Sequence, residues 1–352
     1  MVPADRASRP TAANPIFVFG YPRSGTTLLR ALVGQHSSIH LTQGPELILG
    51  LHRAGYGPRD SIPGDALEAL FKQLRTLSSC RRHFGRIPAH VVKDIVAERR
   101  PFAFWELFER LVRPPDLGTS LWGQKAHNNV FFARDIMQRY PHALIVTVFR
   151  DCRSIVLSHL KKAGRLEPAA EGGSPASGFV RLRNELAMAA ELVVRWDDWM
   201  GAACDARAIA PEGTWLDIRY EDLVRDPEPA LRRVCELAGV AFEARMLDRE
   251  GRGRDSVLRG DSAEAHRSLA GDLDASRIAP FEHAPKVLDA LVEHYAGPRM
   301  RQLGYVLRRP SLRDRAVVRR FARRHDDRLF ADLRRHRAER DPAALLQSAR
   351  AA

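Results

Sequence analysis

The chain has 352 residues, 45% of them hydrophobic, which is enough to bury a sizeable core in one large domain or two small ones. Its 56 basic and 43 acidic residues give a net charge of +13, which suits an anionic ligand, a membrane surface or a nucleic acid. Four scattered cysteines predict reduced thiols in a cytoplasmic protein and no zinc site, and the lack of an apolar run of about 18 residues predicts no transmembrane helix.

The first predicted elements form a strand, a loop and a helix. Residues 1–14 are polar and lack the apolar stretch of a secretory signal, so we expect a disordered N-terminus. The apolar run 15–19 predicts a buried strand that ends at Gly20. Apolar residues at helical spacing predict a helix over 26–36.

Strands and helices continue to alternate along the chain. Predicted strands cover 119–124, 143–149 and 214–220, and predicted helices cover 129–140, 153–162, 179–207 and 227–238. This alternation predicts an α/β fold of three layers, α/β/α, around a central and mostly parallel sheet.

Two loops and a tail complete the organisation. The polar stretches 170–175 and 251–262 are candidate lids or acceptor loops, although a plain surface connection is the simpler interpretation. Residues 308–352 hold 14 arginines against 6 acidic residues, with apolar residues at helical spacing, which predicts a basic amphipathic helix. We therefore expect a main domain over 15–307 and an arginine-rich helical tail over 308–352.

The segment after the first strand has the spacing of a phosphate-binding loop. Gly20 and Gly25 give the GxxxxG pattern, in which backbone N–H groups and the start of the next helix bind an anion. Thr26 stands where a nucleotide hydrolase needs a lysine, and Arg23 supplies the loop's cation instead. A nucleotide-dependent kinase is therefore an alternative and not the first choice. The candidate anion-binding residues are Arg23, Ser24, Gly25, Thr26 and Thr27.

A second anion site is predicted where strand 143–149 ends. Arg150 follows this strand, on the side of an open α/β sheet where ligands bind, and its guanidinium can hold a phosphate by two hydrogen bonds. Ser158 follows one to two helical turns later and can face the same phosphate. The simpler interpretations are a surface Arg–Asp pair and an ordinary helix-face serine.

These motifs resemble those of the sulfotransferases that use 3′-phosphoadenosine 5′-phosphosulfate (PAPS). Residues 22–27 match the family's 5′-phosphosulfate loop, in the style of its bacterial and tyrosylprotein branches, and Arg150 with Ser158 matches its 3′-phosphate motif. Residues 219–223 match its Arg-Tyr-Glu-Asp-Leu block, which implies that Tyr220 lies near the adenine. The resemblance runs patchily from residue 15 to 305 and implies PAPS as donor, adenosine 3′,5′-bisphosphate as product, and no required metal.

The resemblance also implies catalytic residues, with the general base left open. Lys125, with Arg23, is expected at the leaving group. Glu46 falls near the glutamate that is the base in tyrosylprotein sulfotransferases, and His127 resembles the histidine of the Lys-x-His motif of cytosolic sulfotransferases. Gln124 replaces a glutamate of the bacterial pattern and cannot act as a base. Glu46 and His127 both remain candidates.

The acceptor has no signature that we find in this sequence. A small molecule, glycan, lipid or peptide with a hydroxyl or amine would fit, and the oligomeric state is equally open. The basic tail also allows a different function, peripheral binding to an anionic membrane, with nucleic acid less favoured. Its simplest interpretation is a helix that packs its apolar face on the body of the protein.

Overall fold

The computed structural model describes most of the chain. The described residues are 14–44, 46–77, 80, 84, 87–113, 121–164, 185–248, 251, 269 and 278–341. The predicted disordered N-terminus up to residue 13, the loop 170–175 and, apart from Gly251, the loop 251–262 lie outside these residues.

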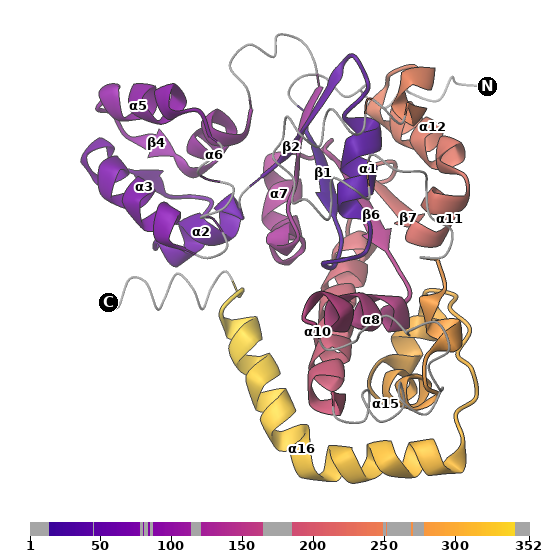
Figure 1. The fold of residues 1–352 in the computed structure, drawn as a ribbon. Coiled ribbons are helices and arrows are strands. Elements are labelled where there is room, and N and C mark those ends of the chain that lie inside the picture. The colour runs from indigo at the N-terminus through magenta and orange to yellow at the C-terminus, as the bar shows by residue number, and fades with distance from the viewer. Residues whose placement is uncertain are drawn as a thin grey trace, which may run out of the picture.

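The core of the fold is a five-stranded sheet in the order β2-β5-β1-β6-β7 (Figure 1). All four strand pairs are parallel, which confirms the predicted α/β architecture. Parallel strands place their carboxyl ends at one edge, where ligands bind in open α/β sheets. The strands are β1 (Ile16–Phe19), β2 (Ile39–Gln43), β5 (Leu121–Lys125), β6 (Leu144–Phe149) and β7 (Trp215–Arg219).

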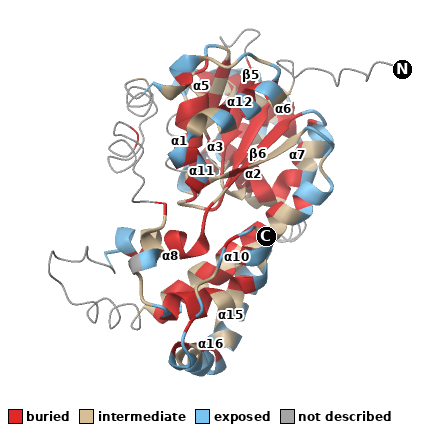
Figure 2. Ribbon diagram, turned by 90° about the vertical axis from the view of Figure 1, so that its right-hand side faces the viewer, coloured by how far each residue is buried: buried red, intermediate tan, exposed pale blue. Residues whose placement is uncertain are grey.

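Both faces of the sheet are covered by helices. In β1, Ile16 and Val18 pack in one apolar cluster with α1, α11 and α12, whereas Phe17 and Phe19 pack in the other cluster with α6, α7, α8 and α10. Successive side chains on a strand point to opposite faces, so one run of four apolar residues supplies both layers. Figure 2 shows the strands buried between them. These helices are α1 (Thr26–Val33), α6 (Phe104–Val112), α7 (Ala133–Arg139), α8 (Cys152–Lys162), α10 (Leu186–Ala208), α11 (Tyr220–Arg225) and α12 (Pro227–Ala238).

A small helical lobe lies between β2 and β5 in the chain and was not predicted. Figure 1 shows it beside the sheet, and it contains a short antiparallel pair of strands that are distant in the sequence. Its elements are α2 (Leu47–Arg53), β3 (Ser61–Ile62), α3 (Leu67–Thr76), α5 (Ala89–Ala97), β4 (Phe102–Ala103) and α6. Glu46, at the start of α2, is the one predicted site residue that this lobe carries.

The predicted basic tail forms the long helix α16 (Leu312–Ala338), which starts with a capping box made by Ser311 and Asp314. It buries Val318, Ala322 and Leu333. Figure 1 shows α16 running beneath α15 (Val287–Gln302) and α10 and then rising toward α2. Within the described part of the chain, no helix is long and apolar enough to cross a membrane.

A buried ion-pair network ties α8 to α15. Arg153 contacts Asp151 at 2.6 Å and Asp289 at 2.8 Å, and all three side chains are almost inaccessible to solvent. Arg308, just before α16, also reaches Asp289, at 2.5 Å. Buried charges are tolerated when they are paired in this way, so the network couples the carboxyl edge of β6 to the start of the tail.

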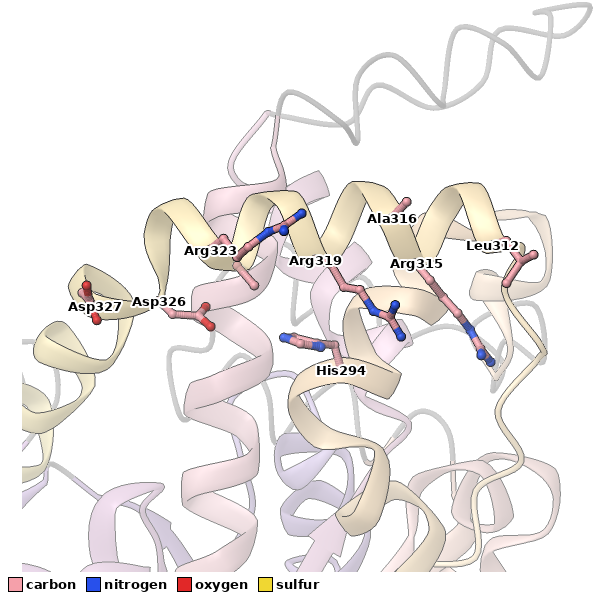
Figure 3. A pocket seen from close by; sticks show the side chains of 9 residues that line it. His294, Leu312, Arg315, Ala316, Arg319, Arg323, Asp326 and Asp327 are labelled. Atoms are coloured by element: carbon pink, nitrogen blue, oxygen red, sulfur yellow. The ribbon is translucent and has the colours of Figure 1, made fainter.

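A groove of about 690 Å³ separates α15 from the first half of α16 (Figure 3). Arg315 and Arg319 of α16 and His294 of α15 line it from opposite sides. Arg315 also pairs with Glu293 at 3.2 Å. All the lining residues come from α15 and α16, so the groove is separate from the predicted donor site.

Candidate functional site

The loop between β1 and α1 turns sharply at Ser24. The Ser24 backbone N–H and hydroxyl both donate to the Tyr21 carbonyl, at 3.1 and 2.7 Å. Arg23 and Gly25 on either side have left-handed backbone angles, with φ of 75° and 96°. Left-handed residues in such turns form the N–H concavities that hold anions, and the amino end of α1 adds its partial positive charge.

Tyr220 lies directly over this loop. A Cβ atom added at Gly25 would come within 2.3 Å of the Tyr220 ring, so only glycine fits there. The Arg150 guanidinium stacks on the same ring, 4.1 Å from its centroid. The chain segment 219–223 is therefore adjacent to both predicted anion sites, as the resemblance implies for a residue beside a nucleotide base.

The two predicted anion sites touch each other. The Nε of Arg23 donates to the Ser158 hydroxyl at 3.0 Å, and an Nη of Arg150 donates to the Arg23 carbonyl at 3.0 Å. Burial lowers the pKa of Arg150, with the neighbouring Arg23 lowering it further and Tyr220 and Glu221 opposing. Arginine stays charged in proteins, so this buried edge of the sheet favours an anion.

Lys125, His127 and Glu46 form a second connected group. Lys125 ends β5 and is 5% exposed, which is unusual for lysine unless it has a role or a partner. Its Nζ lies 3.0 Å from His127 Nε2. His127 Nδ1 lies 2.6 Å from the Gly20 carbonyl, and because a carbonyl only accepts, Nδ1 carries the hydrogen. This contact joins the group to the start of the phosphate loop.

Glu46 is held by the backbone of the neighbouring segment. Its two carboxylate oxygens accept N–H groups of His127 and Asn128, each at 3.0 Å. Burial raises the Glu46 pKa, while these N–H groups and Lys125 act in the opposite direction. A carboxylate with a raised pKa is a stronger base than a free glutamate.

Sequence reasoning missed the residues that surround the group formed by Lys125, His127 and Glu46. Trp199 of α10 donates its indole N–H to the His127 carbonyl at 2.9 Å and so helps to fix that segment. Arg195 of α10 and Arg340, just beyond α16, act electrostatically on Tyr21 of the loop. Nothing distinguished Arg340 from the other 13 arginines of the tail, because its position depends on where the helix ends in space.

Together, the parallel sheet, the turn at Ser24 and the clustered cations define an α/β protein with a phosphate-type loop. Among the described residues, no group of three or more His, Cys, Asp or Glu side chains could hold a metal ion. Arg23, Arg150 and Lys125 each bring positive charge to the site.

Comparison with known proteins identifies the family. A family model described as the sulfotransferase family matches residues 15–244, well over half of the chain. The chain therefore belongs to the sulfotransferase family and is an enzyme of sulfuryl transfer. This finding supersedes the kinase alternative.

Similar proteins agree with this assignment. A Caenorhabditis briggsae protein provisionally assigned as a protein-tyrosine sulfotransferase is 22% identical over 232 residues, which are 66% of this chain and 68% of that protein. The sulfotransferase domain of the Synechococcus PCC 7002 olefin synthase has a TM-score of 0.55 at 19% identity, covering 86% of this chain and 98% of that one. The sulfotransferase domain of the curacin biosynthetic pathway has a TM-score of 0.51 at 18% identity, covering 84% and 99%. These structures share the fold.

Proposed function

We propose that the enzyme takes its sulfuryl group from PAPS and transfers it to a hydroxyl or amine of its acceptor. The observation that carries this proposal is the contact between the two anion sites through Arg23, Arg150 and Ser158. A donor with a phosphosulfate at one end and a 3′-phosphate at the other needs two such sites within one nucleotide's length.

This proposal assigns each part of the donor to residues of the chain. Residues 23–27 would hold the 5′-phosphosulfate, Arg150 and Ser158 the 3′-phosphate, and Tyr220 the adenine. The donor supplies an activated sulfuryl group. Lys125 and Arg23 would stabilise the negative charge that develops on the leaving phosphate, which is the role that preorganised cations play in group transfer.

Hydrogen-bonding capacity supports Glu46 as the general base. A carboxylate offers about four acceptor positions, and the two backbone N–H groups use only two of them. His127 has a single lone pair, on Nε2, and Lys125 lies within hydrogen-bond distance of it. Glu46 can therefore accept the acceptor's proton as the site stands, whereas His127 could do so only after Lys125 turns toward the leaving group. His127 remains the rival base.

Ligand binding tests the donor assignment. We expect adenosine 3′,5′-bisphosphate to bind without added metal, measured by calorimetry, and ATP with Mg²⁺ to bind at least ten times more weakly. Arg150→Ala should reduce affinity for the bisphosphate far more than affinity for adenosine 5′-monophosphate, which lacks the 3′-phosphate. Equal losses for both nucleotides would place the 3′-phosphate elsewhere. A labelled-donor assay against small-molecule, glycan, lipid and peptide acceptors then identifies the acceptor class.

The cellular location of the enzyme, and its contact with membranes, form a separate proposal. We infer a cytoplasmic protein, which the four free cysteines support. The exposed arginines of α16 also favour a peripheral contact with anionic membranes. Removing residues 310–352 should then weaken binding to phosphatidylserine liposomes, and unchanged binding would eliminate the membrane contact.

A further inference from the structure

The end of the tail is anchored beside the catalytic group. Arg337 contacts Asp198 of α10 at 2.5 Å, and Glu339 lies 3.8 Å from Arg53 of α2. These two contacts hold the last turn of α16 between the main body and the helical lobe. The following residue, Arg340, therefore has a defined position.

Arg340 lies beside the segment that follows β5, which also holds Glu46. Its guanidinium lies 5.0 Å from the ring centre of Phe131. Phe131 belongs to the 3₁₀ helix Asn128–Phe132, whose first N–H group is bound by Glu46. Arg340 and the proposed base, Glu46, thus contact the same short helix.

The electrostatic neighbours of Arg340 agree with this position. Burial lowers its pKa most, Tyr21, Glu46 and Asp198 raise it, and the second cation, Arg195, lowers it. Arg195 is already paired with Glu191 at 2.5 Å. Within the described part of the chain, no carboxylate oxygen lies within 4.0 Å of the Arg340 guanidinium.

A half-buried guanidinium without a carboxylate partner is costly, and a bound anion offsets that cost. The guanidinium has five N–H donors in a planar fork that suits carboxylate and phosphate groups. The donor's own phosphates are assigned to Arg23 and Arg150, so an anion at Arg340 would belong to the other substrate.

We propose that Arg340 binds an anionic group, a carboxylate or a phosphate, on the sulfuryl acceptor and so selects acidic acceptors. The proposal rests on the proposed function, because it takes Glu46 as the place where the acceptor hydroxyl lies. Arg340 is a specificity-determining residue in this account, contributed by the tail, while the chemistry stays with the residues at the sheet edge.

The test uses three phenolic probes that differ in charge: 4-hydroxybenzamide, 4-hydroxybenzoate and 4-hydroxyphenyl phosphate. Their binding to the enzyme saturated with adenosine 3′,5′-bisphosphate is measured by calorimetry, and their sulfation with labelled PAPS. The unmodified chain should bind at least one anionic probe about tenfold or more tightly than the amide, since a hydrogen bond to a charged group is worth about that much. Whichever anion is preferred distinguishes a carboxylate from a phosphate site.

Arg340→Gln should abolish this preference and leave the amide unchanged, whereas Arg340→Lys should keep part of it. Arg334→Gln removes an exposed arginine from α16, close to Arg340 in the sequence, and should change nothing. Equal losses for all three probes in Arg340→Gln would indicate a structural role or an effect on Glu46, and would overturn the proposal. No preference for an anionic probe, or no binding of any probe, would overturn it too.

The donor provides the check that separates the two proposals. If the unmodified chain does not bind adenosine 3′,5′-bisphosphate, the proposed function fails. If it binds the bisphosphate and shows no charge preference among the probes, only the role of Arg340 fails.

Discussion

The Nε of Arg23 donates to the hydroxyl of Ser158 at 3.0 Å, which joins the loop after β1 to the middle of α8 across 135 residues of sequence. The bond means that the residue assigned to the phosphosulfate and the residue assigned to the 3′-phosphate orient each other. Substitution of either residue should therefore weaken the binding of both ends of the donor.

Removing the Ser158 hydroxyl should weaken donor binding. Ser158→Ala takes away one partner of the Arg23 guanidinium, and hydrogen bonds to charged groups contribute enough for roughly a tenfold loss of affinity. Calorimetry with adenosine 3′,5′-bisphosphate measures the change. Adenosine 5′-monophosphate serves as the control ligand. A smaller loss for the monophosphate indicates a direct contact with the 3′-phosphate, and unchanged affinity for both would remove Ser158 from the site.

A side chain at Gly25 should disable the loop. Gly25→Ala combines a φ of 96° with a Cβ only 2.3 Å from the Tyr220 ring, so the loop or Tyr220 must move. We expect at least a tenfold loss of donor affinity. Gly213→Ala is the matched control, because Gly213 has a φ of 76° and nothing within 4 Å of the added carbon. That variant should lose only about 1 kcal/mol of stability from backbone strain. Equal donor affinity in the two variants would contradict the assignment of residues 23–27 to the phosphosulfate of the donor.

The two candidate bases can be separated by conservative substitutions. Glu46→Gln keeps an oxygen that can accept a backbone N–H but cannot take a proton from the acceptor. His127→Asn keeps a donor for the Gly20 carbonyl and removes Nε2. The true base should lose about 10²-fold or more in turnover at saturating donor. We expect that loss in Glu46→Gln. The reverse result would make His127 the base, and near-normal turnover in both variants would reject both.

The pH dependence follows from the raised pKa of Glu46. A base must be unprotonated to work, so activity should rise with pH through a pKa above the ordinary glutamate value of 4.5. The profile of kcat/KM against pH in the free enzyme should therefore have its acid limb at a higher pH than a solvent-exposed glutamate would give. Glu46→Asp should shift this limb, and a limb unchanged by that substitution would assign it to another group.

The docking of α16 should weaken in acid. Burial, with Arg340, Arg195 and Arg53 nearby, lowers the pKa of His336 to about 4. An unfolded histidine titrates near 6.5, so between these values the unfolded chain binds more protons and the fold loses stability as the pH falls. The full loss should be about 1–2 kcal/mol after allowance for partial exposure. Thermal unfolding from pH 7 to 4 should show it, and His336→Asn should flatten the dependence.

The sequence predicted four of the five strands, and the two clearest, β1 and β6, are apolar runs followed by a clear break. β1 and β6 are buried on both faces, so their residues leave little ambiguity. β2 was missed because Ile39–Gln43 holds only two apolar residues, with three polar ones among them. The helical lobe that follows has no motif to reveal it.

The position of Glu46 depends on contacts that are distant in the sequence. Gln43 of β2 pairs with Lys125 of β5, and this register carries the start of α2 to the N–H groups of His127 and Asn128. The resemblance to known sulfotransferases pointed to Glu46 and His127 separately. That Glu46 accepts the backbone N–H of His127, and that Arg340 lies over the ring of nearby Phe131, follows only from the folded chain.

The ion pair between Arg308 and Asp289 limits how the protein can be shortened. The change in composition near residue 308 suggests a natural place to end the chain, but a truncation before Arg308 would remove one of the two cations that face the inaccessible Asp289 carboxylate. Arg153 would then have to neutralise two carboxylates alone. It lies at the start of α8, the helix that carries Ser158. A shortened enzyme that begins its deletion at residue 310 keeps this charge balance, so the two deletions, which differ by two residues, should differ in solubility and in donor binding.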